Sequence, residues 1–384
     1  MIDDVLFREA CCGCGACGEI CPTEAIRMGE NARGFIIASV QADKCIHCDL
    51  CDKICPVKTQ QKQEEITCYA LKLSDTDSLM QSQSGGAFYA VAKSILQEGG
   101  VVYGVSNEDI RDVRTVRVDC LEDLHKLLKS KYVQADSTQT HELVEEDLRS
   151  GRTVFYSGTA CVVQGLKNYL SHRKVSQMNL LTCDLICHGV PSRSLDRDFI
   201  ARMEKKQKSR VTGLLYRDKS KGWGSHQECY TFADGNKYHT NEKVIVFSKG
   251  FSLSSACFQC EFTTPYRVAD MTIGDFWSLG QVGMSINQFP SGLSVCLVRN
   301  AGINRRIRQM TENGELQCSE IHLEHAMQWN LERPSVKPVK YDVFWRKYAR
   351  NRFKTLWPVY FALTSREKAG RMCRKILSRL RLKR

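Results

Sequence analysis

The stretch "CCGCGACGEICP", residues 11–22, holds five cysteines in twelve positions. Its pattern C-x2-C-x2-C-x3-C-P returns 34 positions later in "CIHCDLCDKICP", residues 45–56, with each of these cysteines and the proline in place. This spacing is typical of 4Fe–4S ligation, in which four thiolates hold one cubane. The repeat therefore predicts two 4Fe–4S clusters within the first sixty residues.

The wiring of the two clusters follows a known rule: the first three cysteines of a run hold one cluster, and the fourth holds the other. This rule assigns cluster I to Cys11, Cys14, Cys17 and Cys55, and cluster II to Cys45, Cys48, Cys51 and Cys21. Cys12 is left over, because its counterpart in the repeat is Ile46, and we expect a small packed side chain there. Zinc is the alternative, but zinc sites use paired C-x2-C units. The module resembles bacterial-type two-cluster ferredoxins, which implies a relay of single electrons.

The composition and charge of the chain indicate its cellular compartment and the class of partner it can bind. The 384 residues include 20 cysteines, yet "MIDDVLFREA" lacks the apolar core of a signal peptide, and no apolar run reaches membrane-span length. We therefore expect a cytoplasmic protein whose cysteines are metal ligands and small core residues. The net charge of +12 lies in residues 346–384, which hold 14 Lys/Arg and one acid. The rest is close to neutral, which argues against nucleic-acid binding.

The chain divides into three segments: a two-cluster ferredoxin-like domain at 1–60, a body at 61–340 and a basic tail at 341–384. The polar stretch "VKTQQKQEEIT", 57–67, predicts a linker. The fold class we expect is a small ferredoxin module followed by a mixed α/β flavin-binding body.

Hydrophobic periodicity predicts elements in the body. Helices are expected at 86–100, 121–130 and 161–172, and strands at 101–106, 153–158 and 179–189. This alternation favours partly parallel pairing. From about residue 205 more antiparallel structure is expected, with strands at 211–218, 227–240 and 243–250 and a type I′ turn in "ADGN". In the module, "TEAIRMG", 23–29, predicts a short helix with Thr23 as its N-cap.

Four stretches of the body suggest a ligand site. "SQSGGAF" (82–88) and "FYSGTACVVQGL" (155–166) each put small residues before a helix, where backbone N–H groups bind a phosphate or flavin edge. "CDLICHGVPS" (183–192) ends a buried strand, the place where α/β proteins bind ligands. "CFQCEFTTPYRVADMTIGDFWSLG" (257–280) adds a C-x2-C pair and a "GDFW" turn. An ordinary helix-entry loop is the alternative for the first stretch.

Together these stretches resemble the coenzyme F420 hydrogenase/dehydrogenase beta-subunit family. The matching pieces are "SQSGGAF", "LLKSKYVQAD", "YSGTACVVQGL", "CDLICHGVPS" and "CFQCEF…RVADMTIGDFW", in the family's order over about residues 80–280. The resemblance implies FAD, which joins the two-electron chemistry of hydride to the single electrons of iron–sulfur clusters. In this family the second stretch usually reads "GTPCQ", whereas this sequence reads "GTACVVQ". The difference weakens any expectation of polar contacts at that turn.

The same resemblance implies site residues. The FAD or substrate pocket is expected to involve Ser84, Gly85, Gly86, Lys131, Tyr132, Gly158, Thr159, His188 and Asp275. Lys131 suits a flavin phosphate or the N1/O2 locus, and His188 suits substrate orientation or proton transfer. The alternatives are a solvated surface lysine and a satisfied histidine at a strand end.

Four scattered cysteines fall in the four matching stretches. We expect a third 4Fe–4S cluster near the flavin, held by Cys161, Cys187, Cys257 and Cys260. A structural zinc, with Cys183 as a further ligand, or buried free thiols are the alternatives.

The expected function is an FAD- and 4Fe–4S-dependent oxidoreductase that exchanges hydride with an F420-like deazaflavin or another small molecule, and single electrons with a ferredoxin-like partner. Two rivals remain: a non-catalytic electron-transfer subunit, and a reductase in polysaccharide or cell-surface sugar biosynthesis, since relatives occur outside deazaflavin-using organisms. The tail pattern "RMCRKILSRLRLKR", 371–384, predicts a basic helix. We expect this helix either to make a peripheral contact with the inner membrane face or to dock on the body or a partner.

Overall fold

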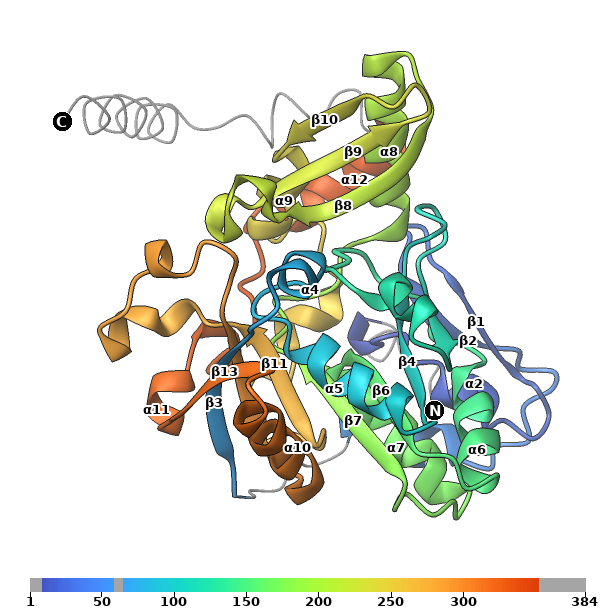
Figure 1. The fold of residues 1–384 in the computed structure, drawn as a ribbon. Coiled ribbons are helices and arrows are strands. Elements are labelled where there is room, and N and C mark those ends of the chain that lie inside the picture. Colours follow the sequence, from blue (N-terminus) through green and yellow to red (C-terminus); the bar gives the residue numbers. More distant parts are fainter. Residues whose placement is uncertain (1–8, 59–64, 352–384) are drawn as a thin grey trace. The chain divides into compact units, whose positions relative to one another are not determined.

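The computed structural model describes residues 9–58 and 65–351 (Figure 1). The chain falls into two compact units, Met1–Lys337 and Pro338–Arg384. The first unit contains the cysteine-rich module and all three sheets. In the second unit the described part is one helix, α12 (Tyr341–Asn351). The tail helix expected at 371–384 lies outside the described residues, as does most of the expected linker. Within the described ranges, no helix is long and apolar enough to cross a membrane.

The cysteine-rich module is a two-stranded sheet flanked by two short helices. Its elements are α2 (Ala16–Glu19), β1 (Ile26–Glu30), β2 (Ile36–Val40), α3 (Leu50–Lys53) and the 3-10 turn η1 (Pro56–Lys58). Each helix begins one residue before the third cysteine of its run, so the first part of each run is a loop. The expected helix at 23–29 is wrong. Residues 26–30 pair antiparallel with 36–40, because Ile26 is buried on the sheet face that the cysteines cover.

An eight-stranded mixed sheet forms the body, in the order β13-β3-β12-β11-β7-β6-β4-β5. β11, β7, β6 and β4 run parallel in the middle, and the outer strands pair antiparallel. The strands are β3 (Thr67–Leu73), β4 (Val101–Ser106), β5 (Arg114–Val118), β6 (Val154–Thr159), β7 (Leu180–Leu185), β11 (Met271–Asp275), β12 (Ser294–Val298) and β13 (Leu316–Ile321). The chain thus returns to this sheet after leaving it at residue 185.

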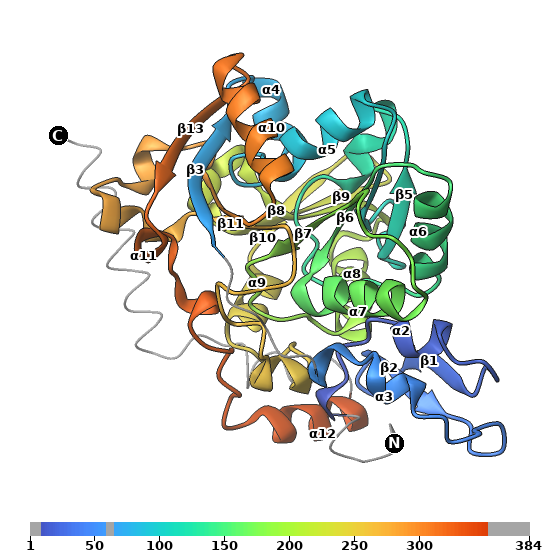
Figure 2. The ribbon, with the colours of Figure 1, turned by 90° about the horizontal axis from the view of Figure 1, so that it is seen from below.

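Helices cover both faces of this sheet (Figure 2). Alternate residues of β4 face opposite cores: Val102 packs with α5 and α10, whereas Tyr103 packs with α6 and α7. The body helices are α4 (Thr76–Gln81), α5 (Ala87–Gln97), α6 (Thr140–Arg149), α7 (Ala160–His172), α10 (Ala301–Glu312) and α11 (Leu323–Ala326). The expected helices at 86–100 and 161–172 and the three expected strands before residue 190 are confirmed.

A separate three-stranded antiparallel sheet follows, in the order β10-β9-β8. Its strands are β8 (Val211–Asp218), β9 (Gln227–Phe232) and β10 (Lys237–Thr240), with α8 (Arg193–Gln207) packed on one face and α9 (Glu242–Ser248) after it. Short 3-10 helices are η2 (Glu122–Leu127), η3 (Lys219–Lys221), η4 (Trp223–Ser225), η5 (Ser255–Gln259), η6 (Trp277–Val282), η7 (Ile286–Gln288) and η8 (Trp329–Leu331).

Three local expectations are corrected here. Where a strand was expected at 243–250, residues 242–248 form helix α9, and Gly250, with φ of 76°, follows its end. The turn between β9 and β10 is not type I′, because only Gly235 has positive φ; the Phe232 N–H bonds the Asn236 carbonyl across a three-residue loop. The helix expected at 121–130 is the shorter 3-10 helix η2.

Candidate functional site

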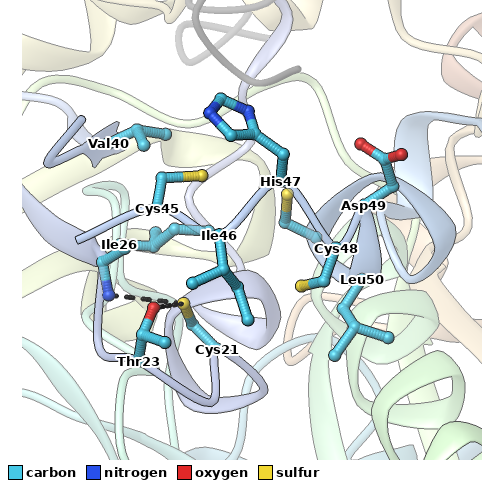
Figure 3. A pocket seen from close by; sticks show the side chains of 12 residues that line it. Cys21, Thr23, Ile26, Val40, Cys45, Ile46, His47, Cys48, Asp49 and Leu50 are labelled. Carbon is cyan, nitrogen blue, oxygen red and sulfur yellow. Dashed lines mark hydrogen bonds between the residues drawn. The ribbon is translucent and has the colours of Figure 1, made fainter. Parts of the chain in front are cut away.

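The second cysteine run and Cys21 line one cavity, which we call site II (Figure 3). Cys45, Cys48 and Cys51 come from the loop before α3 and from α3 itself, and Cys21 comes from the turn after α2. This grouping is the one expected for cluster II. Cys48 is exposed, and the neighbouring Ile46 is 61% exposed, so site II has an open side.

Hydrogen bonds already favour a thiolate at site II. The Ala25 N–H donates to the Cys21 sulfur at 3.3 Å, and Thr23 lies beside the same sulfur. Burial opposes ionisation of Cys21, but donors from Thr23, Ala25 and Ile26 together lower the pKa of its thiol. N–H groups aimed at ligand sulfurs are a recurrent means of tuning iron–sulfur clusters.

Site I is the cavity lined by Cys11, Cys14, Cys17 and Cys55, together with Cys12. It adjoins site II, because Cys17 and Cys51 pack against the same Ile26 and Ala38 pair. Burial, and then the charges of Cys14, Cys11, Cys55 and Cys51, raises the pKa of Cys17 well above its ordinary value. Ionisation of the whole set therefore needs an offsetting positive charge, such as iron.

α7 holds site I against the body. Cys14 is buried, and Gly165 of α7 faces it so closely that a Cβ on Gly165 would lie 2.8 Å from the Cys14 sulfur. Cys14 and Ala16 share a core cluster with Val163 and Leu166 of α7. The glycine thus permits the close approach of a ligand loop to a helix.

Four cysteines of the body also come together, and we call them the body quartet. Cys161 lies in the first turn of α7, Cys187 follows β7, and Cys257 and Cys260 lie in and after η5. Burial raises the pKa of Cys187 to about 12, and the charges of Cys161 and Cys260 add to this rise. Burial and Cys161 likewise raise the pKa of Cys260 to about 11. These mutual effects mean that the four thiols are neighbours.

Backbone N–H groups point at two sulfurs of the body quartet. Gly189 donates to Cys187 and Val190 donates to Cys257, each at 3.3 Å. The donor set of four cysteines with N–H donors fits an iron–sulfur cluster.

Cys12 links site I to the body quartet. Its thiol hydrogen-bonds to the sulfurs of Cys14 and Cys161, and these two bonds, ahead of burial, raise the pKa of Cys12 well above its usual value. The same bond with Cys12 is the first cause of the lowered pKa of Cys161. Cys12, which has no counterpart in the repeat, is therefore a packed side chain, as expected. It lies between the cysteines of site I and those of the body quartet.

Polar contacts attach the module to the body at several points. Gln134 accepts from the Ile36 N–H at 2.7 Å and donates to the Ile36 carbonyl at 3.1 Å, in the manner of a neighbouring strand. The Glu19 carboxylate accepts from the N–H groups of Gln139, His141 and Glu142 at the start of α6. Sequence reasoning missed these residues, because a buried glutamine within "LLKSKYVQAD" gives no sign of its partner.

A second set of expected residues gathers where β11 and β12 meet the loop before α5. The Ser84 hydroxyl donates to the Leu293 carbonyl at 2.7 Å, and the Gly85 N–H donates to Ser294 Oγ at 2.8 Å. A Cβ on Gly85 would lie 2.1 Å from the Leu71 carbonyl oxygen, so only glycine fits. Gly86, with φ of 84°, is the N-cap of α5. The loop "SQSGGAF" is thus fastened to the sheet edge.

Asp275 ends β11 beside this loop and is held by two residues that sequence reasoning missed. The Trp223 indole N–H donates to Asp275 at 2.5 Å, and Arg217, 2% exposed, forms an ion pair with it. Lys219 donates to the carbonyls of Leu79 and Ser84, at 2.7 and 2.9 Å. The sequence signal that could have pointed to these residues was the pair of basic residues, Arg217 and Lys219, at the end of the strand predicted at 211–218.

His188, which follows Cys187 of the body quartet, and Tyr132 contact the same aromatic ring. The Phe247 ring stacks on Tyr132 at 4.8 Å and meets the His188 ring edge-on at 4.9 Å. Ser335 donates to the His188 carbonyl at 2.5 Å and lies 3.2 Å from Nδ1. Burial lowers the pKa of His188, so the imidazole is neutral near pH 7.

The other expected residues lie nearby on the same edge of the sheet. Gly158 and Thr159 end β6, where the Thr159 hydroxyl lies 3.3 Å from the Cys161 sulfur. Lys131 donates to the Leu128 carbonyl at 2.6 Å, and burial lowers its pKa to about 7. In this structure Lys131 thus caps η2. Its expected contact with a flavin stays a prediction.

Several buried polar atoms of this region lack a partner within the described protein. They are Ser82 Oγ, both amide atoms of Gln83, His188 Nε2 and Arg217 Nε. Buried polar groups are normally satisfied, so unsatisfied ones mark places where a ligand or water belongs. Hydrogen-bonding atoms of this kind suit a polar ligand such as FAD.

Comparison with known families agrees with these sites. Residues 151–324 match the C terminus of the beta subunits of coenzyme F420 hydrogenase/dehydrogenase, and residues 10–59 match the 4Fe–4S dicluster domain. The search of curated proteins gave no match. A chain of the xenon-derivatised F420-reducing [NiFe] hydrogenase complex from Methanosarcina barkeri is 18% identical, with a TM-score of 0.49 over 77% of this chain and 91% of that one.

The two cysteine runs and the matched segments together define an iron–sulfur electron-transfer protein. More particularly, the later part of the chain is similar to the C terminus of coenzyme F420 hydrogenase/dehydrogenase beta subunits, and it follows an N-terminal segment that matches the 4Fe–4S dicluster domain. The two clusters expected from the repeat and the family resemblance are confirmed by these matches.

Proposed function

We propose that the chain is an FAD- and 4Fe–4S-dependent oxidoreductase, which exchanges hydride with a small molecule and single electrons with a ferredoxin-like protein. The observation that carries this proposal is the contact of Cys12 with both Cys14 and Cys161. It joins site I to the body quartet, and Cys187 of the quartet precedes His188 at the pocket edge. Site II, site I, the body quartet and the pocket thus form one connected series.

The chain's residues have distinct tasks in this series. The cysteines of sites I and II and of the body quartet hold clusters, and the N–H groups of Ala25, Gly189 and Val190 stabilise the negative sulfurs. Clusters carry one electron each, and FAD converts between these and the electron pair of a hydride. The close contact of α7 with Cys14 keeps water out of the junction between site I and the body.

The pocket residues hold the flavin and the substrate in this proposal. The loop of Ser84, Gly85 and Gly86 supplies a close backbone surface, and Asp275 and Tyr132 supply polar atoms beside it. The neutral His188, with Nε2 unpartnered, accepts or returns a proton at that nitrogen. A deazaflavin of the F420 type is the substrate class that the matched family suggests.

The protein partner docks at site II. This end is open, with exposed Cys48 and Ile46, whereas Cys14 is buried and the four cysteines of the body quartet are intermediate in exposure. Because electron transfer needs close approach, the exposed cluster is the one that a ferredoxin-like partner reaches.

The test is anaerobic purification of the full chain, with iron and extracted flavin measured per chain. The proposal expects roughly twelve irons and one FAD, since each cubane holds four irons. It also expects reduction of a viologen acceptor by reduced F420 or another hydride donor. Folded protein with about eight irons and no flavin would instead identify a non-catalytic electron-transfer subunit.

A further inference from the structure

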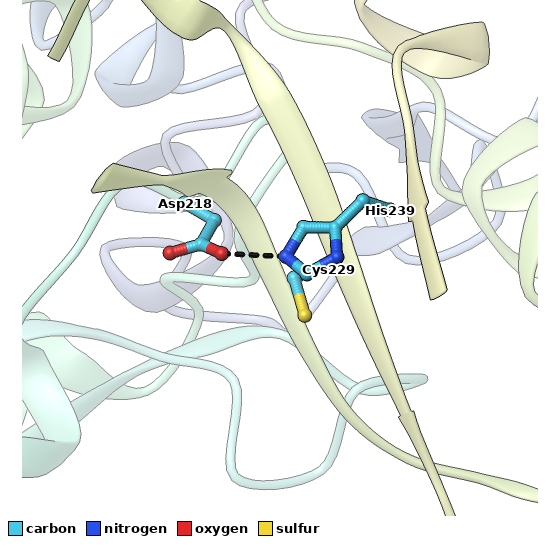
Figure 4. A group of neighbouring side chains, drawn as sticks. All are labelled: Asp218, Cys229 and His239. Carbon is cyan, nitrogen blue, oxygen red and sulfur yellow. Dashed lines mark hydrogen bonds and ion pairs between the residues drawn. The ribbon is translucent and has the colours of Figure 1, made fainter. Parts of the chain in front are cut away.

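A mixed group of donor atoms lies outside all the sites described above. Asp218, Cys229 and His239 come from β8, β9 and β10, and one donor atom of each lies within 4.8 Å of the other two (Figure 4). His239 Nε2 is 2.8 Å from Asp218 Oδ2. None of these residues belongs to the cysteine repeat or to the pocket.

Strand register brings the three side chains to one face. His239 pairs directly with Cys229 across β10 and β9, and directly paired residues of antiparallel strands point to the same side. Tyr230 and Tyr238, their neighbours in sequence, pack toward α8 on the opposite face. Cys229 and His239 therefore share the face away from α8.

A β-bulge adds Asp218 to that face. Leu215 pairs with Cys229, and Asp218 pairs with Gln227, so β8 carries one extra residue between these pairs. In a regular ladder Asp218 would point toward α8, but the bulge turns it to the side of Cys229. Tyr216 and Arg217 are both buried as a consequence.

We propose that Asp218, Cys229 and His239 bind a divalent zinc-type cation, with water in the fourth position. A thiolate, a carboxylate and a neutral imidazole carry two negative charges together, which match a divalent ion. Zinc bonds of about 2.0–2.3 Å put tetrahedral ligands roughly 3.3–3.8 Å apart, so the three atoms need only small adjustments. Ser220 also positions Asp218, because its N–H donates to Oδ1 at 3.0 Å and its hydroxyl donates to Oδ2 at 2.6 Å.

The cation would brace the pocket. Asp218 lies between Arg217, which pairs with Asp275, and Lys219, which holds the carbonyl of Ser84. A metal that fixes Asp218 to β9 and β10 therefore also fixes the start of η3, from which Lys219 reaches the loop before α5. The site is structural in this role, and Cys229 is 3% exposed.

The test uses the full-length holoprotein with its iron centres filled, so that zinc does not enter the cysteine quartets. After equilibration with zinc chloride and removal of loose metal, zinc and iron are counted by mass spectrometry, and zinc K-edge absorption reports the ligands. We expect about one zinc per chain, bound to one sulfur and three nitrogen or oxygen atoms. Zinc surrounded by four sulfurs would place it in a cysteine quartet and overturn the proposal.

Variants complete the test. Cys229→Ala and His239→Gln should each lower bound zinc at least tenfold with iron unchanged. Cys296→Ala, which changes another buried sheet cysteine, and His125→Gln, which changes an exposed histidine, should keep the zinc. Because His239 lies at a partly exposed strand position, His239→Gln should fold even if Cys229→Ala does not. Equal zinc content in the wild type and in His239→Gln would overturn the proposal. The three residues would then form only a His–Asp hydrogen bond beside a buried thiol.

Discussion

At the scale of the residue, Gly165 shows how little room exists between the module and the body. A methyl group there would overlap the Cys14 sulfur. Gly165→Ala should cost about 1–3 kcal/mol as an overpacking change and displace Cys14. We expect lower iron content at site I, measured by iron analysis of anaerobic protein. Gly29→Ala is the control, because a Cβ at Gly29 meets open space. Gly151→Ala is unsuitable, because Gly151 has φ of 82°.

Cys12 gives the complementary prediction, because it contacts ligand cysteines without being assigned to a cluster. Cys12→Ser keeps a hydroxyl donor toward Cys14 and Cys161 and should retain the full iron content. Cys14→Ser should lose roughly the iron of one cluster. Iron analysis of both variants checks this contrast, and a loss of four irons in Cys12→Ser would make Cys12 a ligand.

Lys131 predicts a dependence of stability on pH. Burial lowers its pKa in the folded protein to about 7, whereas the unfolded value is near 10.5. Between these values the unfolded chain binds more protons, so raising the pH stabilises the folded protein. Relative to Lys131→Met, the wild type should gain up to about 1.4 kcal/mol per pH unit from pH 7 to 9. Unfolding midpoints at both values measure this gain.

A control separates Lys131 from general effects of charge. Lys205 on α8 is exposed, so Lys205→Met should show the same pH dependence as wild type. If the stability of the wild type changes with pH in the same way as that of Lys131→Met, Lys131 is charged in the folded protein and the prediction is wrong.

At the scale of the element, sequence reasoning was accurate where the periodic pattern was long. The α5 and α7 helices and the β4, β6 and β7 strands lie where hydrophobic spacing predicts them. It failed for short apolar runs, because residues 26–30 take their structure from the neighbouring strand 36–40, and the first turn of residues 243–248 is held by the Glu228 carboxylate. The cysteine grouping of sites I and II was predictable because the repeat encodes it. Arg217, Trp223 and Gln134 were not, since their partners lie far along the chain.

The seam between β2 and the body yields a prediction at this scale. Gln134 satisfies both the N–H and the carbonyl of Ile36. Gln134→Leu leaves both groups buried without partners and should cost about 2–3 kcal/mol. Anaerobic thermal unfolding should show this loss, with earlier release of iron from the module. Gln309→Leu, at an exposed glutamine of α10, is the control and should unfold as wild type does.

At the scale of the whole molecule, the central claim is that three cluster sites and a flavin pocket form one series. The module is fixed to the body by Gln134, Glu19 and the contact of Cys14 with α7. A rigid attachment of this kind suits electron relay, because the distance between centres stays constant. The body quartet is the link on which the claim depends.

The most direct measurement is an anaerobic redox titration of the full chain, followed by electron paramagnetic resonance, with Cys187→Ala beside the wild type. The account predicts three magnetically interacting 4Fe–4S signals in the wild type and two in Cys187→Ala, with flavin retained. Two signals in both proteins would contradict it, because the body quartet would then hold no cluster and the series would end at site I.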